Sequence, residues 1–297
     1  MIVVPIDITF SIVPYIKRRT ITTLNDIFRY RRNIFSISKD ILDEITSDDM
    51  ILSTLLDLKN KDDYTYKHSI NVAIFSLALG ISLNFKIEDL KDLFIGALLH
   101  DVGKIFIPSS ILLKNGPLSE EEFIIMKKHP QKGYDYLLKN LKLSNRSLII
   151  SLEHHERIEG SGYPNNLNFN EIDIFSKIVS IADVYDALTS RRSYRDPVCA
   201  SDALDYLYKN SCKTFDKSLV DIFSKLIMPY PCGTIVELNT GDIGIVLKTY
   251  VNFPLRPTLK IVKSSKKKKG SILNLIDHLN IYIYSIQSFD LKDTLVN

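Results

Sequence analysis

The histidines of this chain are concentrated in one part of it. The sequence holds six, and five of them fall between positions 68 and 155. His100 is followed directly by Asp101, and His154 by His155. Neutral imidazoles together with carboxylates are the ligand set for iron, manganese, zinc or nickel rather than for calcium. These residue types at this spacing predict a transition-metal site.

The candidate ligands are too many for one ion. Asp183 joins them, because it lies on a helical pattern that is otherwise apolar on that side, where a carboxylate is costly to bury without a positive partner. Five histidines and two aspartates suit two ions that share one bridging carboxylate. The alternative is a set of unrelated core and surface histidines. That reading would suit any one of them alone, but not the two adjacent pairs and Asp183 together.

Composition sets broad limits on the fold and the partners. The 297 residues are enough for one large domain or two modest ones, and 25% charged with 45% hydrophobic residues is ordinary for a globular protein. The net charge of +3 indicates no polyanionic partner. The lysine run "KSSKKKKG" (263–270) is interpreted as a solvated loop, with an anion or nucleic-acid patch as the alternative. We therefore expect no nucleic-acid partner.

Cysteine usage and hydropathy favour a reducing, cytoplasmic location. Cys199, Cys212 and Cys232 are isolated, which argues against a disulfide framework and against a cysteine zinc site. No apolar run reaches the roughly 18–20 residues of a membrane span. The apolar start "MIVVPIDITFSIVPYIK" lacks a basic first region and a cleavage site. Its alternating pattern from residue 2 to residue 12 predicts a strand instead.

The elements that must position the histidines are helices. Apolar residues recur at helical spacing in "LKDLFIGALLHD" (90–101) and "SKIVSIADVYDAL" (176–188). After "MPYPCG" (228–233) the period changes, and "GTIVELNTGDIGIVLKTY" predicts a hairpin, with "LRPTLKIVKS" and "LNIYIYSI" as further strands. We predict a mainly α protein: a short N-terminal α/β segment of unknown role (1–52), a helical bundle (53–228) and a small β-rich extension (229–297). Pairing of the N-terminal strand with that extension is a guess.

The motifs resemble a known family. The "HD" of "HDVGK" (100–104) and the "GYP" of "EGSGYP" (159–164) are the name-giving motifs of the HD-GYP domain. That domain is a bacterial subgroup of the HD metal-dependent phosphohydrolases, and its characteristic activity is hydrolysis of cyclic di-GMP. The resemblance covers residues 65–197 in the order "YTYKHSINVA", "LLHDVGKIFIP", "ILLKNGPLSEEEF", "MKKHPQKGYDYL", "HHERIEGSGYP" and "IADVYDALTSRRSYR".

The resemblance implies a metal-ligand set, with Asp101 as the bridging ligand. Some family members carry an extra glutamate one helical turn before the first histidine, which supports a third metal. Tyr64 stands at that place here, so we predict two divalent ions. Iron or manganese is expected first, with zinc, nickel or cobalt as alternatives. By position, the implied ligands are His68, His100, Asp101, His129, His154, His155 and Asp183.

The resemblance also implies contacts to the substrate. They fall on Lys104 beside the attacked phosphate, on Gly162 and Tyr163 of the GYP loop, and on Arg192 and Arg195 for the phosphates. An arginine suits bidentate contact with a phosphate, although either could be a surface residue at a helix end. The sequence departs from the family pattern at positions 159, 191 and 193, where glutamate, arginine and serine stand. These departures bear on substrate fit more than on metal binding.

The predicted reaction is phosphodiester hydrolysis. Two metals that share Asp101 as a ligand would hold a bridging hydroxide, and this hydroxide would attack the phosphorus in line. Lys104 would help to stabilise the charge on the phosphate oxygens. The product would be the linear dinucleotide pGpG, and a second hydrolysis would give GMP. Two alternatives stay open: a receptor that binds cyclic di-GMP without turnover, and an HD phosphohydrolase for another nucleotide. A homodimer is also left open.

Overall fold

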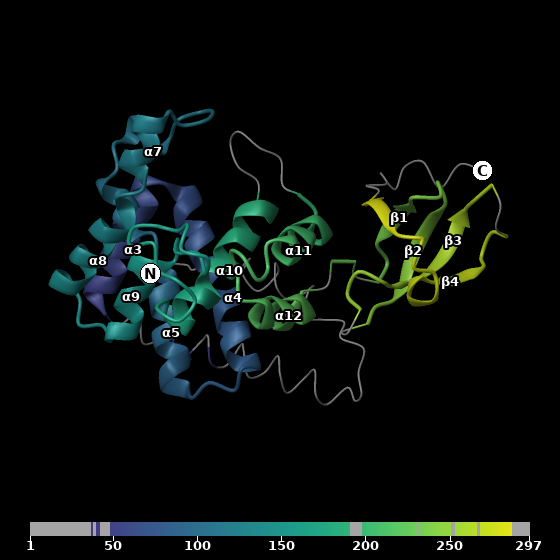
Figure 1. Cartoon of the computed structure of the whole chain (residues 1–297), viewed down its shortest axis with the longest axis horizontal. Coiled ribbons are helices and arrows are strands. Elements are labelled where there is room, and N and C mark those ends of the chain that lie inside the picture. The colour runs from purple at the N-terminus through teal and green to yellow at the C-terminus, as the bar shows by residue number, and fades with distance from the viewer. Residues whose placement is uncertain are drawn as a thin grey trace. The chain divides into compact units, whose positions relative to one another are not determined.

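The structure is a computed structural model of the whole chain (Figure 1). It describes residues 37, 40–41, 48–190, 198–227, 229–230, 232–250, 253–265 and 268–286. The chain divides into two compact units. Of the described residues, those from 37 to 198 and from 203 to 223 form one unit, and those from 199 to 202 and from 224 to 286 belong to the other. The predicted N-terminal strand, and its pairing with the extension, lie outside the described residues.

Helices make up the first unit, as the sequence predicts. They begin with α3 (Asp49–Lys61), α4 (Asp63–Ser82), α5 (Ile87–Leu99) and the 3-10 turn η1 (Val102–Phe106). They continue with α6 (Ser109–Leu112), α7 (Glu120–Met126), α8 (His129–Asn140), α9 (Asn145–Glu153) and α10 (Ile174–Thr189). The helices α11 (Ala200–Lys209) and α12 (Lys217–Leu226) follow. The predicted break at residues 60–63 is real: Asp62 ends α3 and caps the first turn of α4.

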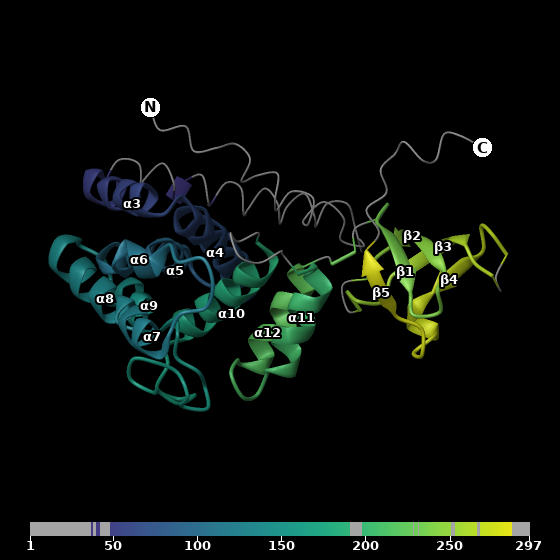
Figure 2. The ribbon, with the colours of Figure 1, turned by 90° about the horizontal axis from the view of Figure 1, so that it is seen from above.

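Helix α5 packs against both α4 and α9, while α10 lies beside α4 and also contacts α9 (Figure 2). α8 packs on α9 and on η1. Residues such as Leu93, Ala97, Ile150 and Ile178 are fully buried in these contacts. The helix ends that carry the candidate ligands are thereby drawn together.

Glycines set how closely the elements approach. A Cβ added at Gly103 would lie 1.9 Å from the carbonyl oxygen of His129 and 2.6 Å from the backbone nitrogen of Gly133. Real Cβ atoms do not reach such distances, so only glycine lets η1 lie against the start of α8. The same contact brings the HD pair next to His129. The glycine that follows the HD pair therefore serves packing.

One antiparallel sheet forms the body of the other unit. Its strand order is β4-β3-β2-β1-β5. The strands are β1 (Ile235–Leu238), β2 (Ile243–Lys248), β3 (Thr258–Lys263), β4 (Ile272–Asn274) and β5 (Ile283–Ile286), with a 3-10 turn η2 (Leu275–Asp277). β1 and β2 form the predicted hairpin, with Ile235 opposite Ile245. The sheet buries one face over a core that includes Val236, Val246 and Leu259.

The sheet differs from the prediction in one strand. β4 is only three residues long, too short for alternation to be read from the sequence. The described part of the lysine run lies at the end of β3 and in the connection to β4. The predicted fold class, a helical bundle with a small β extension, is confirmed. The domain boundaries at residues 52/53 and 228/229 stay predictions.

The described helices also bear on membrane insertion. None of them combines the length and the apolar character that a bilayer span requires. The cytoplasmic location stays a prediction.

Candidate metal centre

The predicted ligands come from helix ends and helix faces of one unit. His68 lies in α4, His100 ends α5, His129 begins α8, and His154 ends α9. All four are buried. The remaining three are Asp101, the half-buried His155 and Asp183 of α10. Positions up to 115 residues apart in the sequence thus meet in the interior.

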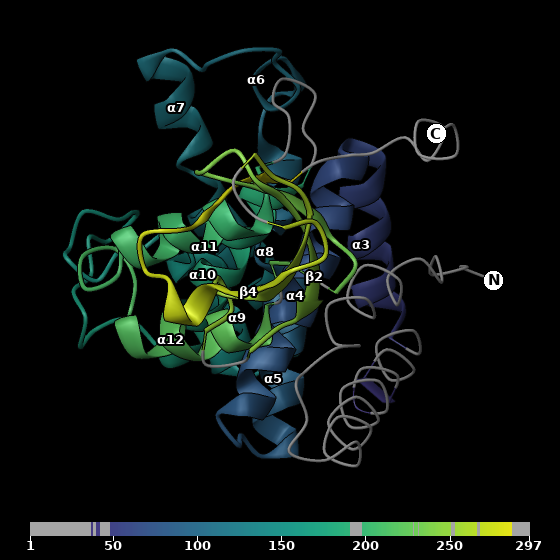
Figure 3. The same cartoon turned by 90° about the vertical axis from the view of Figure 1, so that its right-hand side faces the viewer.

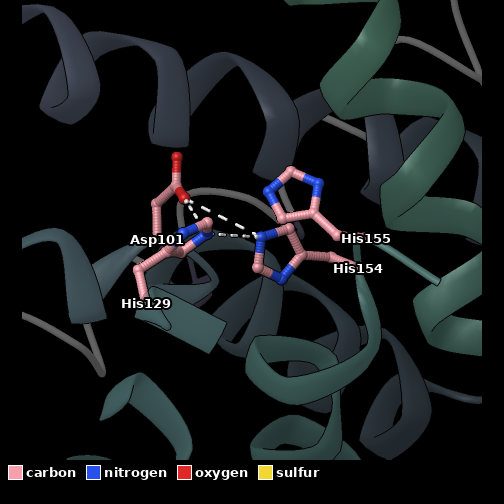
Figure 4. A group of neighbouring side chains, drawn as sticks. All are labelled: Asp101, His129, His154 and His155. Carbon is pink, nitrogen blue, oxygen red and sulfur yellow. Dashed lines mark hydrogen bonds and ion pairs between the residues drawn. The ribbon is translucent and has the colours of Figure 1, made fainter. Parts of the chain in front are cut away.

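Two groups of ligand atoms meet at Asp101. Within each group, all the ligand atoms lie within 4.8 Å of one another. The first group is Asp101, His129, His154 and His155, and Figure 4 shows these side chains converging. The second group is His68, His100 and Asp101. Asp183 adjoins the second group, since its Oδ1 is 3.0 Å from His68 Nε2. One carboxylate shared by two groups is the arrangement expected of a bridging ligand.

Backbone carbonyls fix the orientation of three of the rings. The Nδ1 atoms of His100, His129 and His154 each lie within hydrogen-bond distance of a carbonyl three residues earlier, at 2.7, 2.8 and 3.0 Å. A carbonyl oxygen only accepts, so each Nδ1 carries the proton and donates it. The Nε2 of each neutral ring is then left with a lone pair, which is the form that binds a metal.

The lone pairs face one another inside the protein. His129 Nε2 and His154 Nε2 are 3.3 Å apart, and His129 Nε2 is 3.2 Å from Asp101 Oδ1. His100 Nε2 and Asp101 Oδ1 are buried without a hydrogen-bond partner. Buried acceptors with no donor are costly and rare. A cation held between them would satisfy all of these atoms, so the residues fit a metal centre.

Asp186 holds the ring of His68. Its Oδ2 is 2.7 Å from His68 Nδ1, and its Oδ1 accepts hydrogen bonds from Asn71 at 2.9 Å and Ser190 at 3.0 Å. A carboxylate behind a ligating histidine fixes the ring and raises its basicity. Burial alone would lower the pKa of His68, but the carboxylates of Asp183 and Asp186 raise it to about 9.

Burial and charge set the protonation of the other ligands. Burial and the neighbouring His100 hold the pKa of His154 well below its usual value, and burial together with His154 does the same for His155. Both rings are therefore neutral at neutral pH. Burial would raise the pKa of Asp101, but the charge of Lys104 together with the neighbouring His100 outweighs it and holds that pKa well below its usual value. The bridging candidate is thus ionised.

Lys104 lies at the edge of the centre. Its Nζ donates to Asp101 Oδ2 at 2.6 Å, and 21% of its side chain is exposed. It reaches this place because η1 turns the chain back within three residues of Asp101. A cation at this position would also attract an anionic group that approaches Asp101.

The GYP loop folds back onto the histidine pair. The buried carboxylate of Glu156 accepts hydrogen bonds from the backbone nitrogens of Asn165 at 2.6 Å and Leu167 at 3.0 Å. A Cβ at Gly162 would lie 2.4 Å from Glu156 Cα, so only glycine lets the loop approach this turn. Gly162 therefore has a packing reason to be glycine. Its predicted contact with the substrate stays a prediction.

Tyr163 lies against one of the candidate ligands. Its ring stacks on His155, with centroids 4.7 Å apart and planes at 28°. Burial raises the pKa of its hydroxyl, so the side chain stays neutral. Tyr163 thus borders the candidate metal centre, with one ring face covered by His155, and its predicted contact with the substrate stays a prediction. Arg192 and Arg195, also predicted to contact the substrate, lie outside the described residues.

Comparison with known families agrees with this geometry. The HD domain family model matches residues 51–219, which is more than half of the chain and includes every candidate ligand. The chain belongs to the HD domain family. The HD-GYP resemblance found in the sequence is confirmed. A second model, described as a KOW domain associated with HD domains, matches residues 235–292, where this HD protein carries its sheet.

Several relatives of this HD protein have names. It is 34% identical over 235 residues to the cyclic di-GMP phosphodiesterase PA4108 of Pseudomonas aeruginosa, covering 78% of this chain and 56% of the relative. It is 32% identical over 231 residues to the cyclic di-GMP phosphodiesterase PdeB of Borreliella burgdorferi, covering 75% of this chain and 60% of the relative. A 3'3'-cGAMP-specific phosphodiesterase of Vibrio cholerae is 32% identical to it over 202 residues, covering 67% of this chain and 46% of the relative. The chain spans about half the length of these relatives.

Three supporting residues were missed from the sequence. Asp186 and Asn71 each lie one helical turn beyond a predicted ligand, which is the signal that could have found them. Glu156 follows the histidine pair directly, but nothing in the sequence showed that its carboxylate would be buried and hold a loop. No KOW-type extension was predicted from the strand pattern either.

We expect Asp186→Asn to weaken metal binding by roughly 10- to 100-fold, because it removes the charge that fixes His68 and raises its basicity. Competition with a coloured chelator for Mn²⁺ would measure the change. Asp89→Asn is the matched control, since it removes a carboxylate that pairs with Arg146 at 2.8 Å. Equal affinities for the wild type and Asp186→Asn would contradict the supporting role of Asp186.

Proposed function

We propose that this HD protein is a cyclic di-GMP phosphodiesterase that works with two divalent transition-metal ions. The observation that carries the proposal is that two ligand groups share the single carboxylate of Asp101. The names of the relatives supply the substrate class. Among the ions, iron or manganese is proposed first because imidazole and carboxylate ligands suit both.

Each side chain has a definite task in this proposal. His129, His154 and His155 would hold one ion, and His68 and His100 the other, with Asp183 beside His68 and Asp101 between the ions. Bound there, the ions would polarise the phosphate and lower the pKa of water. Tyr64 occupies the place one turn before His68, and its ring stacks on the ring of that histidine, with the two centroids 5.9 Å apart. The carboxylate that supports a third ion in some family members is therefore absent at this place, which supports two.

Lys104 would act on the phosphate. Its ammonium lies beside Asp101 and is partly exposed, so it can turn toward a phosphate oxygen and stabilise the charge that develops there. A hydroxide formed from water would bond to the phosphorus as the bond to the 3' oxygen breaks. That oxygen would take up the proton released by the water, giving the linear dinucleotide pGpG. A second hydrolysis would give GMP. Arg192 and Arg195 remain the proposed contacts for the substrate phosphates.

Metal content and turnover on one preparation test the proposal. We expect two equivalents of a transition metal per chain by elemental analysis and hydrolysis of cyclic di-GMP that is lost on chelation and restored by metal. The product would be identified by chromatography against pGpG and GMP. Failure to bind any metal after reconstitution would remove the basis of the proposal.

Two other functions would show different outcomes. Two bound metals and binding without turnover would favour a receptor of cyclic di-GMP. Turnover of 3'3'-cGAMP in preference to cyclic di-GMP would favour the substrate named for the Vibrio relative. A panel of cyclic dinucleotides therefore belongs in the same experiment.

A further inference from the structure

An aromatic side chain on α7 lies next to the metal centre and has no part in it. Phe123 contacts the ring of Tyr163, with centroids 6.4 Å apart and planes at 79°. Tyr163 in turn stacks on His155, one of the candidate ligands. Three rings thus lead from the candidate ligands to α7, where 46% of Phe123 is exposed.

The position of α7 itself is unusual. No residue of this helix is buried, and the helix stands at one end of the helical unit next to α6 (Figure 3). Its start is fixed by a capping box between Ser119 and Glu122, and Lys114 pairs with Glu122 at 2.5 Å. The helix is therefore held by polar contacts at its first turn, and the side chain of Phe123 stays partly exposed.

Two neighbours fix the ring of Phe123 and leave it accessible. Lys127 Nζ lies over the ring, 5.1 Å from its centroid, which is a cation–π contact. Tyr163 meets the same ring nearly at right angles. A single exposed phenylalanine is common and by itself has no functional meaning. Here the ring of Phe123 is held in place, lies close to the candidate metal centre and has the ammonium of Lys127 beside it. An aromatic ring and a cation in one place are suited to binding the base and the phosphate of a nucleotide.

Tyr163 is less suited to stack on a base. Its ring is half-buried and already stacks on His155, so one face is unavailable. Two other exposed phenylalanines of this unit make contacts of the same kind, Phe106 with Tyr136 and Phe169 with Lys177, but neither partner is Tyr163 or a candidate ligand. Phe123 is the exposed ring that contacts Tyr163.

The geometry points to Phe123 as the residue that stacks on one nucleobase of the cyclic dinucleotide. This inference rests on the proposed function and adds a specificity-determining residue to it. A base–aromatic stack tolerates any base, because every base has a π face. Phe123 would therefore strengthen binding of cyclic dinucleotides over simple phosphodiesters, without choosing between guanine and adenine.

The test separates base recognition from chemistry. We expect Phe123→Ala in the metal-loaded full chain to weaken binding of a slowly hydrolysed phosphorothioate analogue of cyclic di-GMP by roughly 10- to 100-fold, measured by calorimetry. The KM for cyclic di-GMP should rise to match. Hydrolysis of methyl p-nitrophenyl phosphate, a diester without a nucleobase, should be unchanged. Phe123→Tyr keeps a ring and should restore binding.

Phe169→Ala is the matched control. Phe169 is 44% exposed and has Lys177 Nζ 4.2 Å from its ring centroid, but its removal should leave binding unchanged. An equal loss on both substrates in Phe123→Ala would mean that Phe123 acts by positioning Tyr163 and His155, and would overturn the inference. Unchanged analogue binding in that variant would also overturn it.

The inference and the proposed function can fail separately. If the wild type binds the analogue but does not hydrolyse cyclic di-GMP, the proposed function fails, and loss of binding in Phe123→Ala still supports the stack. If the wild type hydrolyses cyclic di-GMP and Phe123→Ala binds the analogue equally well, only the stack is wrong. Absence of binding by the wild type overturns both.

Discussion

Replacing Asp101 by asparagine is expected to lower the kcat for cyclic di-GMP by about 10³-fold or more, because the variant removes the charge shared by both ligand groups. The amide keeps the size of the side chain, and its oxygen can still accept from Lys104, so the fold should survive. Bound metal should fall below two equivalents. Asp101→Ala should be equally inactive. Turnover, elemental analysis and thermal unfolding on the same preparation measure all three effects.

Asp63→Asn is the control for this prediction. It removes a carboxylate from the same unit, on the exposed side of α4, where Asp63 pairs with Lys67 at 2.6 Å. An exposed pair of this kind contributes little, so activity and metal content should not change. Near wild-type turnover in Asp101→Asn would refute the bridging role. Two retained metals with lost turnover would show that Asp101 acts in another way.

The second large effect concerns packing. Gly103→Ala is expected to destabilise the helical unit by about 3 kcal/mol, the upper end for an added methylene in a packed interior, because the new Cβ would meet backbone atoms of α8. Its melting temperature should fall by roughly 5–10 °C. The clash lies between the HD pair and His129, so a shift of about 1 Å in the ligands should also cost on the order of 10²-fold in turnover.

Gly80→Ala provides the comparison. Its Cβ would meet the Cδ2 atoms of Leu90 and Leu93 at 2.9 Å, and these ends of flexible side chains can move. Alanine also favours the interior of α4 by about 1 kcal/mol over glycine. We expect little change in melting temperature and in activity. Equal stability of Gly103→Ala and the wild type would show that η1 and α8 can separate without cost.

The outline of the fold could be read from the sequence because it depends on local patterns. Apolar residues at helical spacing predicted the helices that became α5 and α10, and alternation around an Asn-Thr-Gly-Asp turn predicted the hairpin of β1 and β2. β4 was not predicted, because a strand of three residues is too short to show an alternation of apolar and polar side chains. The family and its candidate ligands were also readable, since residue types at fixed spacing carry that information.

The sequence by itself thus determined the chemical type of the centre, namely imidazole and carboxylate ligands on helix ends. Only the tertiary structure decided which nitrogen of the His68 ring faces the centre, because that depends on Asp186, 118 residues away. It also decided that Asp101 is shared, that Gly103 allows α8 to approach, and that Phe123 lies beside Tyr163. These features depend on distances between segments that are far apart in the chain. The pattern of apolar and polar residues within one segment does not determine such distances.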